Sequence, residues 1–89
     1  MTVMVDEWRR WGTGRAPSCH LTTDNSNLGE LHRFAAAIGL KRCWFQPRSS
    51  PHYDIMNEPR RRRALQQGAK FVPARIQVIA RLAKRSGDG

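Results

Sequence analysis

Short apolar runs alternate with helical patterns along the chain, and this alternation restricts the possible folds more than any other feature. Residues 2–5, 42–45 and 69–72 are apolar or aromatic runs of the kind that favours β-strands. Segments with apolar residues at helical spacing, bounded by glycine or proline, follow them. Because strands separated by helices usually pair in parallel, the order β-α-β-α-β-α predicts an α/β fold. We expect a small three-stranded, mostly parallel sheet with packed helices and the first strand in its centre.

The first two predicted helices have recognisable starts. Asn27 and Glu30 have the spacing of a capping box, and Gly39 can end the helix that they begin. Either residue of the pair 57–58 can cap a second helix, since Pro59 favours the first turn that follows. These ends predict that the segments are helical, whatever the order of the strands.

The last predicted helix has more apolar surface than a three-stranded sheet needs. It begins at Pro73, and its wide apolar face includes Ile76, Val78, Ile79 and Leu82. An apolar face left over after the core is built can pack against a partner, so this helix is a candidate for homodimer formation. A chain of 89 residues has room for one core. We expect a single domain over residues 1–85 and a flexible C-terminal end over residues 86–89.

The chain is strongly basic, with 16 Lys and Arg residues against 7 Asp and Glu residues and a net charge of +9. This charge favours an acidic partner, either nucleic acid or an acidic protein surface. Arg60, Arg61, Arg62 and Arg63 form a run at the start of the second predicted helix, where backbone N–H groups also favour anions. The alternative is that this run is a solvated basic face.

The sequence gives no indication of a membrane or secreted protein. No apolar run approaches the roughly 20 residues that a membrane-spanning helix needs. Charged residues begin at Asp6, too early for a signal peptide. We therefore expect a cytoplasmic protein without a membrane partner.

Several chemically active side chains are expected at one edge of the predicted sheet. The carboxyl ends of parallel strands and the amino ends of the following helices share an edge, where ligands bind. The candidates for catalysis at this edge are His20, Asp24, His52 and Asp54, and the candidates for ligand contacts are His32, Gln46 and Tyr53. Imidazole titrates near neutral pH, so His20 or His52 could transfer protons.

The same edge is a candidate site for a divalent metal ion. Histidine and carboxylate ligands together suit Zn²⁺, Mn²⁺ or Fe²⁺, whereas a Mg²⁺ site would depend on Asp6, Asp24 and Asp54. No established catalytic or metal-binding motif supports either possibility. The structural alternative is that the aspartates cap loops and helices while the histidines orient them by hydrogen bonds.

Several short segments occur in one order and together resemble a known family. They are residues 3–6 (VMVD), 20–24 (HLTTD), 30–35 (ELHRFA), 38–40 (IGL), 44–46 (WFQ), 51–54 (PHYD) and 68–69 (GA). The ordered set resembles the domain-of-unknown-function family 4031, small proteins of bacteria and many phages. The resemblance implies no activity, because that family has none assigned. One difference is that the loop over residues 24–30 is longer here than is usual in the family.

Two hypotheses for function follow. In the first, the protein binds a phosphate-bearing or acidic partner, such as nucleic acid or a nucleic-acid complex, and hydrolyses a phosphoester at the His and Asp residues. In that version Arg60 or Arg61 would stabilise the phosphate. In the second, the protein is a non-enzymatic inhibitor or adaptor of the phage type that binds a host protein complex.

Overall fold

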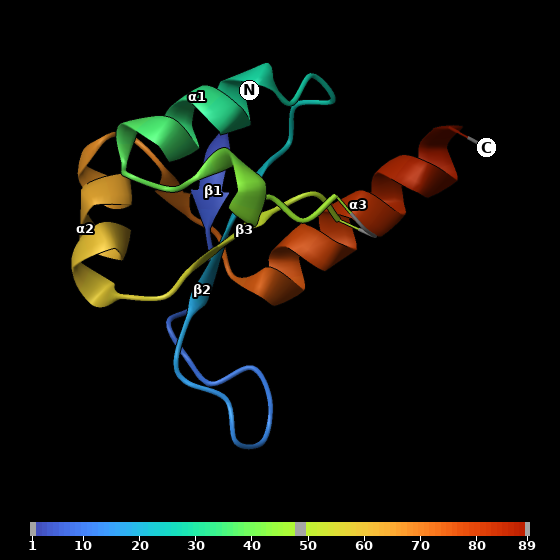
Figure 1. Ribbon diagram of the computed structural model, residues 1–89. Helices are drawn as coiled ribbons and strands as arrows, with labels where there is room; N and C mark the ends of the chain where they lie inside the picture. Colours follow the sequence, from blue (N-terminus) through green and yellow to red (C-terminus); the bar gives the residue numbers. More distant parts are fainter. Residues whose placement is uncertain (1, 48–49, 89) are drawn as a thin grey trace.

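The computed structural model describes residues 2–47 and 50–88, and its centre is a four-stranded sheet (Figure 1). The strands are β1 (Val3–Val5), β2 (Cys19–Thr23), β3 (Tyr53–Ile55) and β4 (Lys70–Phe71), in the order β3-β2-β1-β4. β1 pairs in parallel with β4 and antiparallel with β2, and β2 pairs antiparallel with β3. The fold is therefore α/β with a mixed sheet, and the predicted three-stranded, mostly parallel sheet is wrong.

Two local misassignments explain this difference. Residues 19–23, for which no strand was predicted, form β2, because the 13-residue connection over residues 6–18 lets the chain return beside β1 without a crossover helix. Residues 42–45, predicted as a strand, contain the short 3₁₀-helix η1 (Arg42–Trp44). The last predicted strand is confirmed as β4, and β1 is confirmed as an interior strand, between β2 and β4.

The three α-helices are α1 (Gly29–Ala37), α2 (Glu58–Gln66) and α3 (Ala74–Asp88). The capping box predicted for α1 is wrong, because its N-cap is Leu28, whose side chain makes no capping bond, although Oδ1 of Asn27 accepts a hydrogen bond from the backbone N–H of Gly29 at 2.9 Å. Gly39 ends α1 as predicted, with a φ of 87° that favours glycine. Asn57 caps α2, accepting a hydrogen bond from the backbone N–H of Arg60 at 2.8 Å.

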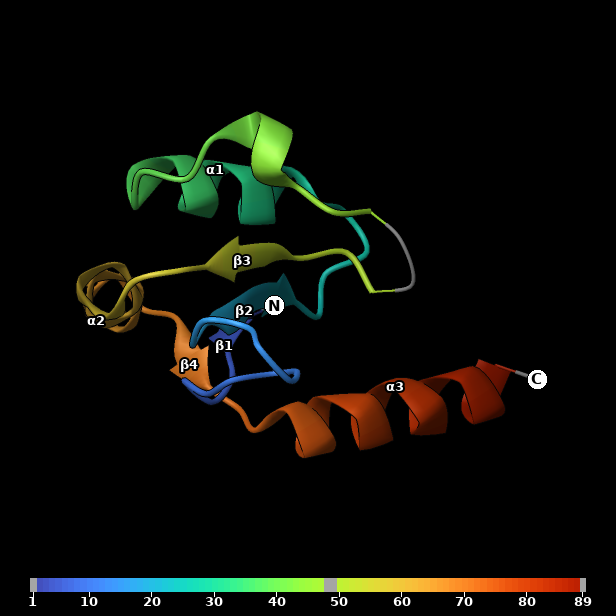
Figure 2. The same cartoon turned by 60° about the horizontal axis from the view of Figure 1, so that its bottom comes forward.

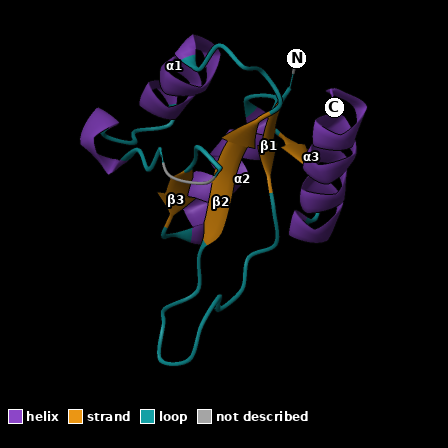
Figure 3. Cartoon of the chain, turned by 90° about the vertical axis from the view of Figure 1, so that its right-hand side faces the viewer, coloured by secondary structure: helices purple, strands orange, loops and turns teal. Residues whose placement is uncertain are grey.

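The sheet separates α1 from α3. Figure 2 shows α1 on one side of the strands and α3 on the other, and Figure 3 shows the same separation from the side. The core lies on the α1 side, where α2 also packs against β1 and β3. Its fully buried side chains include Val5, Leu21, Leu31, Ile38, Tyr53 and Ile55. Because side chains alternate along a strand, the residues of β2 and β3 between these positions face away from the core.

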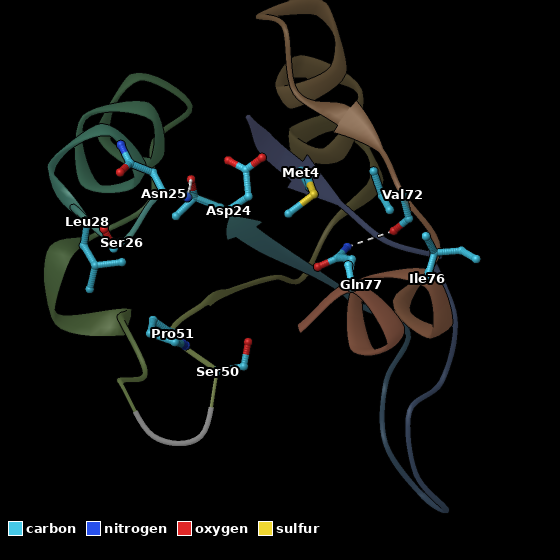
Figure 4. Close-up of a pocket in the computed structure, with 12 residues that line it drawn as sticks. Met4, Asp24, Asn25, Ser26, Leu28, Ser50, Pro51, Val72, Ile76 and Gln77 are labelled. Atoms are coloured by element: carbon cyan, nitrogen blue, oxygen red, sulfur yellow. Dashed lines mark hydrogen bonds between the residues drawn. The ribbon is translucent and has the colours of Figure 1, made fainter. Parts of the chain in front are cut away.

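One buried polar contact links α3 to the sheet. The hydroxyl of Thr22 on β2 donates a hydrogen bond to Oε1 of Gln77 at 2.7 Å. Figure 4 shows the second bond of Gln77, which Nε2 donates to the backbone carbonyl of Val72 at 2.8 Å. Gln77 is 6% exposed, whereas Ile76, Val78, Ile79 and Leu82 are about half exposed. The helix runs through Asp88 and so includes three of the four residues predicted as a flexible end. The fourth, Gly89, lies outside the described residues.

We expect Gln77→Ala to lower the free energy of unfolding by about 1–3 kcal/mol, because it leaves the buried hydroxyl of Thr22 without its acceptor. Denaturant titration measures this loss. In a Thr22→Val background the same change is expected to have a smaller effect, since the contact is already absent. An equal loss in both backgrounds would contradict a specific role for this contact.

Candidate functional site

The antiparallel pairing of β2 places one acidic residue on each side of His20. Val5 lies opposite Leu21 in the register of β1 and β2, so Asp6, which follows β1, lies opposite His20. Across the other edge of β2, Asp54 of β3 is the direct partner of His20. Leu21 faces the core, so its neighbour His20 faces away from it. Asp6, His20 and Asp54 therefore form a row across three neighbouring strands.

Asp6 orients the imidazole of His20. Its Oδ1 accepts a hydrogen bond from the backbone N–H of His20 at 2.6 Å, and its Oδ2 lies 2.6 Å from Nδ1 of the ring. The bond to Asp6 is the main reason that the pKa of His20 is raised; burial opposes the increase, and the charges of Asp6 and Asp54 add to it. With Nδ1 directed at Asp6, Nε2 is available on the side of Asp54.

His52 completes a group of three side chains around one carboxylate oxygen. Oδ1 of Asp54 lies 3.4 Å from Nε2 of His52 and 3.8 Å from Nε2 of His20. Nδ1 of His52 donates to the backbone carbonyl of Ser50 at 2.8 Å, and Nε2 of Gln46 donates to Oδ2 of Asp54 at 2.7 Å. We call His20, His52 and Asp54 the histidine cluster. Gln46, predicted as a ligand contact, instead holds the carboxylate of this cluster.

The histidine cluster is open to solvent and chemically versatile. The side chains of His20, His52 and Asp54 are 28%, 21% and 37% exposed, so small ions and substrates can reach them. One donor atom from each lies within 4.8 Å of the others. Two imidazoles and a carboxylate at this spacing can transfer protons or hold a cation.

A cavity of about 320 Å³ lies beside the cluster and is lined by both His20 and Asp54. The loop between β1 and β2 contributes Trp11, Arg15 and Ser18 to its wall. The ring of Trp11 packs edge-on against His20 with a centroid distance of 4.7 Å, and its Nε1 donates to the carbonyl of Ser18 at 2.8 Å. Arg15 is exposed. The cavity therefore combines an aromatic ring, a cation and two residues of the histidine cluster, His20 and Asp54.

Asp24 lies away from the histidine cluster. It follows β2 at the end opposite His20, where its Oδ1 accepts a hydrogen bond from the backbone N–H of Thr2 at 2.6 Å. Asp24 lies four residue steps along the strand from His20, or about 13 Å. Asp24 instead borders a cavity of about 420 Å³ next to α3, with Met4, Leu28 and Ile76 (Figure 4). The three aspartates predicted for a Mg²⁺ site therefore do not meet.

His32 and Tyr53 form a separate contact on the α1 side of the sheet. Tyr53 is fully buried, and its hydroxyl lies 2.8 Å from Nδ1 of His32. The ring of Phe45 packs edge-on against His32, with a centroid distance of 4.6 Å. Burial lowers the pKa of His32, and the charge of Arg42 adds to this decrease. Both residues, predicted as ligand contacts, pack within the fold at positions apart from the histidine cluster.

In the run of arginines over residues 60–63, two side chains bond to backbone carbonyls and two are exposed to solvent. Nε of Arg60 donates to the carbonyl of Ile38 at 3.1 Å, and a terminal nitrogen of Arg61 donates to the carbonyl of Asp6 at 3.1 Å. These two side chains hold α2 against α1 and the end of β1. Arg62 and Arg63 are exposed. The predicted phosphate contact by Arg60 or Arg61 therefore competes with bonds inside the chain.

Cys19 precedes His20 but is not a suitable metal ligand. It is fully buried, whereas Cys43 is exposed. Neither cysteine forms a disulfide bond within the described residues. Burial raises the pKa of the Cys19 thiol to about 12, with a further contribution from the charge of Asp6. Only a thiolate binds metal or attacks substrate well, so this thiol is inert near neutral pH.

Trp11 and Arg15 are not among the site residues predicted from the sequence, although both lie beside His20 in the structure. The sequence feature that could have predicted their position is the loop of residues 12–18. It follows Trp11 and directly precedes the strand that contains His20. A hairpin reading of this segment predicts that its loop lies next to that strand.

No helix in the described part of the chain is both long and apolar enough to cross a membrane.

A search of the curated proteins and a search of the solved structures each found no significant match. The model of one protein family, described as "Protein of unknown function (DUF4031)", matches residues 3–85. The match includes every strand and the whole histidine cluster. Because it spans nearly the entire chain, this protein belongs to the DUF4031 family.

Proposed function

We propose that this protein binds a nucleic-acid strand in the cavity beside His20 and hydrolyses a phosphoester there. The observation that supports this proposal is the histidine cluster, oriented by Asp6, at the wall of a cavity that also presents Trp11 and Arg15. A cytoplasmic location fits this partner.

The cavity offers the two kinds of contact that a nucleotide needs. A guanidinium such as that of Arg15 binds phosphate oxygens, and an indole such as that of Trp11 can stack on a base. A volume of about 320 Å³ falls at the small end of ligand pockets, which range from about 300 to 1,000 Å³. The net charge of +9 attracts a polyanion from a distance, and Arg62 and Arg63 are exposed on α2, where phosphates can reach them.

Hydrolysis of a phosphoester requires an activated water molecule beside the phosphorus atom. The water oxygen bonds to phosphorus, the P–O bond to the leaving oxygen breaks, and that oxygen receives a proton. The proton lost by the water passes to a base. A cluster of two imidazoles and one carboxylate can activate the water directly as a proton acceptor or through a bound cation.

The test is a cleavage assay with end-labelled single-stranded and duplex DNA and RNA, with and without a chelator. We expect binding that weakens as salt concentration rises, together with cleavage that His20→Gln removes. Binding without cleavage would overturn the hydrolase part of the proposal. The absence of both would overturn the proposal as a whole.

Arg15→Ala is expected to weaken binding to a single-stranded oligonucleotide and to reduce the slope of log affinity against log salt by about 0.7–1. The reason is that one phosphate contact, and the counterion it releases, is lost. Fluorescence anisotropy at several salt concentrations measures the slope. Arg33→Ala is the matched control, because Arg33 is an exposed arginine of α1 that does not line the cavity. Equal slopes for the two variants would exclude Arg15 as a phosphate contact.

The second candidate function is a non-enzymatic inhibitor or adaptor of the phage type. Its support is the apolar surface of α3, where Ile76, Val78, Ile79 and Leu82 are 43–55% exposed. Such a surface suits a protein partner or a second copy of the chain. In this case Ile79→Glu would remove partner binding or dimerisation, measured by analytical ultracentrifugation, without affecting oligonucleotide cleavage.

A further inference from the structure

We infer that His20, His52 and Asp54 bind one divalent transition-metal ion of the zinc class. The ligand atoms are Nε2 of each histidine and Oδ1 of Asp54, which lie together on the face of β2 and β3 that points away from the core. This site differs from the three-aspartate arrangement considered from the sequence, because Asp24 is remote and Asp6 bonds to His20 rather than facing the ion.

The distances between the ligand atoms suit a four-coordinate ion. Two bonds of about 2.0–2.1 Å that meet at a tetrahedral angle separate their ligand atoms by about 3.3–3.4 Å. Oδ1 of Asp54 lies 3.4 Å from Nε2 of His52 and 3.8 Å from Nε2 of His20, and one ligand atom from each of the three residues lies within 4.8 Å of the others.

Each of the three ligands has a hydrogen-bond partner on its other polar atom. Asp6 holds Nδ1 of His20, the carbonyl of Ser50 holds Nδ1 of His52, and Gln46 holds Oδ2 of Asp54. Metal-binding histidines usually donate their second ring nitrogen to a carboxylate or a backbone carbonyl, which fixes the tautomer and the ring orientation. Both arrangements occur here. A chance group of polar side chains would not be expected to have all three ligands oriented in this way.

The ligand set indicates which ions fit. Imidazole nitrogen favours Zn²⁺ and neighbouring transition metals, whereas Mg²⁺ and Ca²⁺ prefer oxygen ligands. Two histidines and one carboxylate leave a coordination position for water, the arrangement of catalytic rather than structural zinc sites. The cavity beside His20 and Asp54 provides space for that water and for a substrate. Water activation by the ion rests on the proposed hydrolase function, whereas binding of the ion does not.

The experiment measures Zn²⁺ binding by the full chain. A Cys43→Ser background removes the exposed thiol, which could otherwise bind zinc between molecules. After dialysis against chelator, isothermal titration gives affinity and stoichiometry, and elemental analysis after gel filtration gives retained metal. We expect one ion per chain, and no displacement by an equal concentration of Mg²⁺. Less than one ion per chain, or displacement by Mg²⁺, would overturn the inference.

Substitutions then test the ligands individually. Asp54→Asn and His52→Gln are each expected to weaken Zn²⁺ binding by at least about 100-fold, and Asp6→Asn, which removes the carboxylate that orients His20, by about 10–100-fold. His32→Gln is the matched control, because His32 bonds to Tyr53 on the other side of the sheet. Affinity that is equal in the His32 and His52 variants would count against the site.

A second measurement does not depend on the folding of any variant. In NMR spectra of the protein with all three histidines retained, Zn²⁺ is expected to shift the imidazole signals of His20 and His52 and to leave those of His32 unchanged. Shifts at His32 alone would overturn the assignment of the ligands. Zinc binding without cleavage of any oligonucleotide would leave this inference standing and overturn the proposed hydrolase, so the two failures are distinguishable.

Discussion

Asp54→Asn is expected to lower the rate of oligonucleotide hydrolysis by at least about 100-fold, equivalent to about 2.7 kcal/mol in transition-state free energy. Oδ1 of Asp54 is the atom shared by His20 and His52, so losing its charge affects proton transfer and cation binding alike. Asparagine keeps the shape, and its own oxygen can accept the hydrogen bond from Gln46. The fold is therefore expected to persist, and initial-rate kinetics with circular dichroism on the same samples check both points.

The matched control for this substitution is Glu58→Gln. Glu58 is an exposed carboxylate in the first turn of α2, at the 4.0 Å limit of an ion pair with Arg62, and it does not border the cavity beside His20. An exposed salt bridge of this kind contributes little to the free energy of unfolding. We expect the control to retain the full rate. An Asp54→Asn protein that is folded and as active as the control would exclude Asp54 from the chemistry.

Leu21→Ala is expected to lower the free energy of unfolding by about 2–5 kcal/mol. Leu21 is fully buried in β2, with Val5 as its partner on one side and Tyr53 on the other, both fully buried. Removing its side chain leaves a cavity in the layer between the sheet and α1. A domain of this size has little stability in reserve, so the melting temperature is expected to fall by about 10 °C or more. Thermal denaturation followed by circular dichroism measures the change.

Leu82→Ala makes the same chemical change at an exposed position. Leu82 is 55% exposed on α3, so its removal is expected to change the stability of the monomer by no more than about 0.5 kcal/mol. A large loss for Leu82→Ala that depends on protein concentration would instead indicate that α3 is covered by a second copy of the chain. Similar, concentration-independent losses for the two leucines would contradict the position assigned to the core.

The two predictions concern opposite faces of the same strand. Leu21 and His20 are adjacent in β2, and the alternation of strand side chains directs one to the core and the other to the histidine cluster. A stability defect in Leu21→Ala with binding unchanged below its melting temperature, together with an activity defect in Asp54→Asn with stability unchanged, would separate the core face from the site face.

The cluster could be predicted in part from the sequence, although for a different physical reason. We expected His20, His52 and Asp54 to meet because the loops of a parallel sheet open on one edge. They meet instead because antiparallel register places His20 opposite Asp54, with His52 two residues from Asp54. The same register moves Asp24 to the other end of β2 and places Asp6 against His20. Register depends on long-range pairing, which residue type and local spacing do not reveal.

The amino-acid sequence alone determined the locations of α1, α2, α3, β1 and β4, because apolar spacing and the glycine and proline residues at element ends act through the local backbone. It also determined the basic charge and the residue types available for chemistry. Only the tertiary structure decided that residues 19–23 pair as a strand between β1 and β3, and that residues 42–44 do not pair as one. Strand pairing is a contact between distant segments, so its free energy depends on neighbours that a local pattern does not identify.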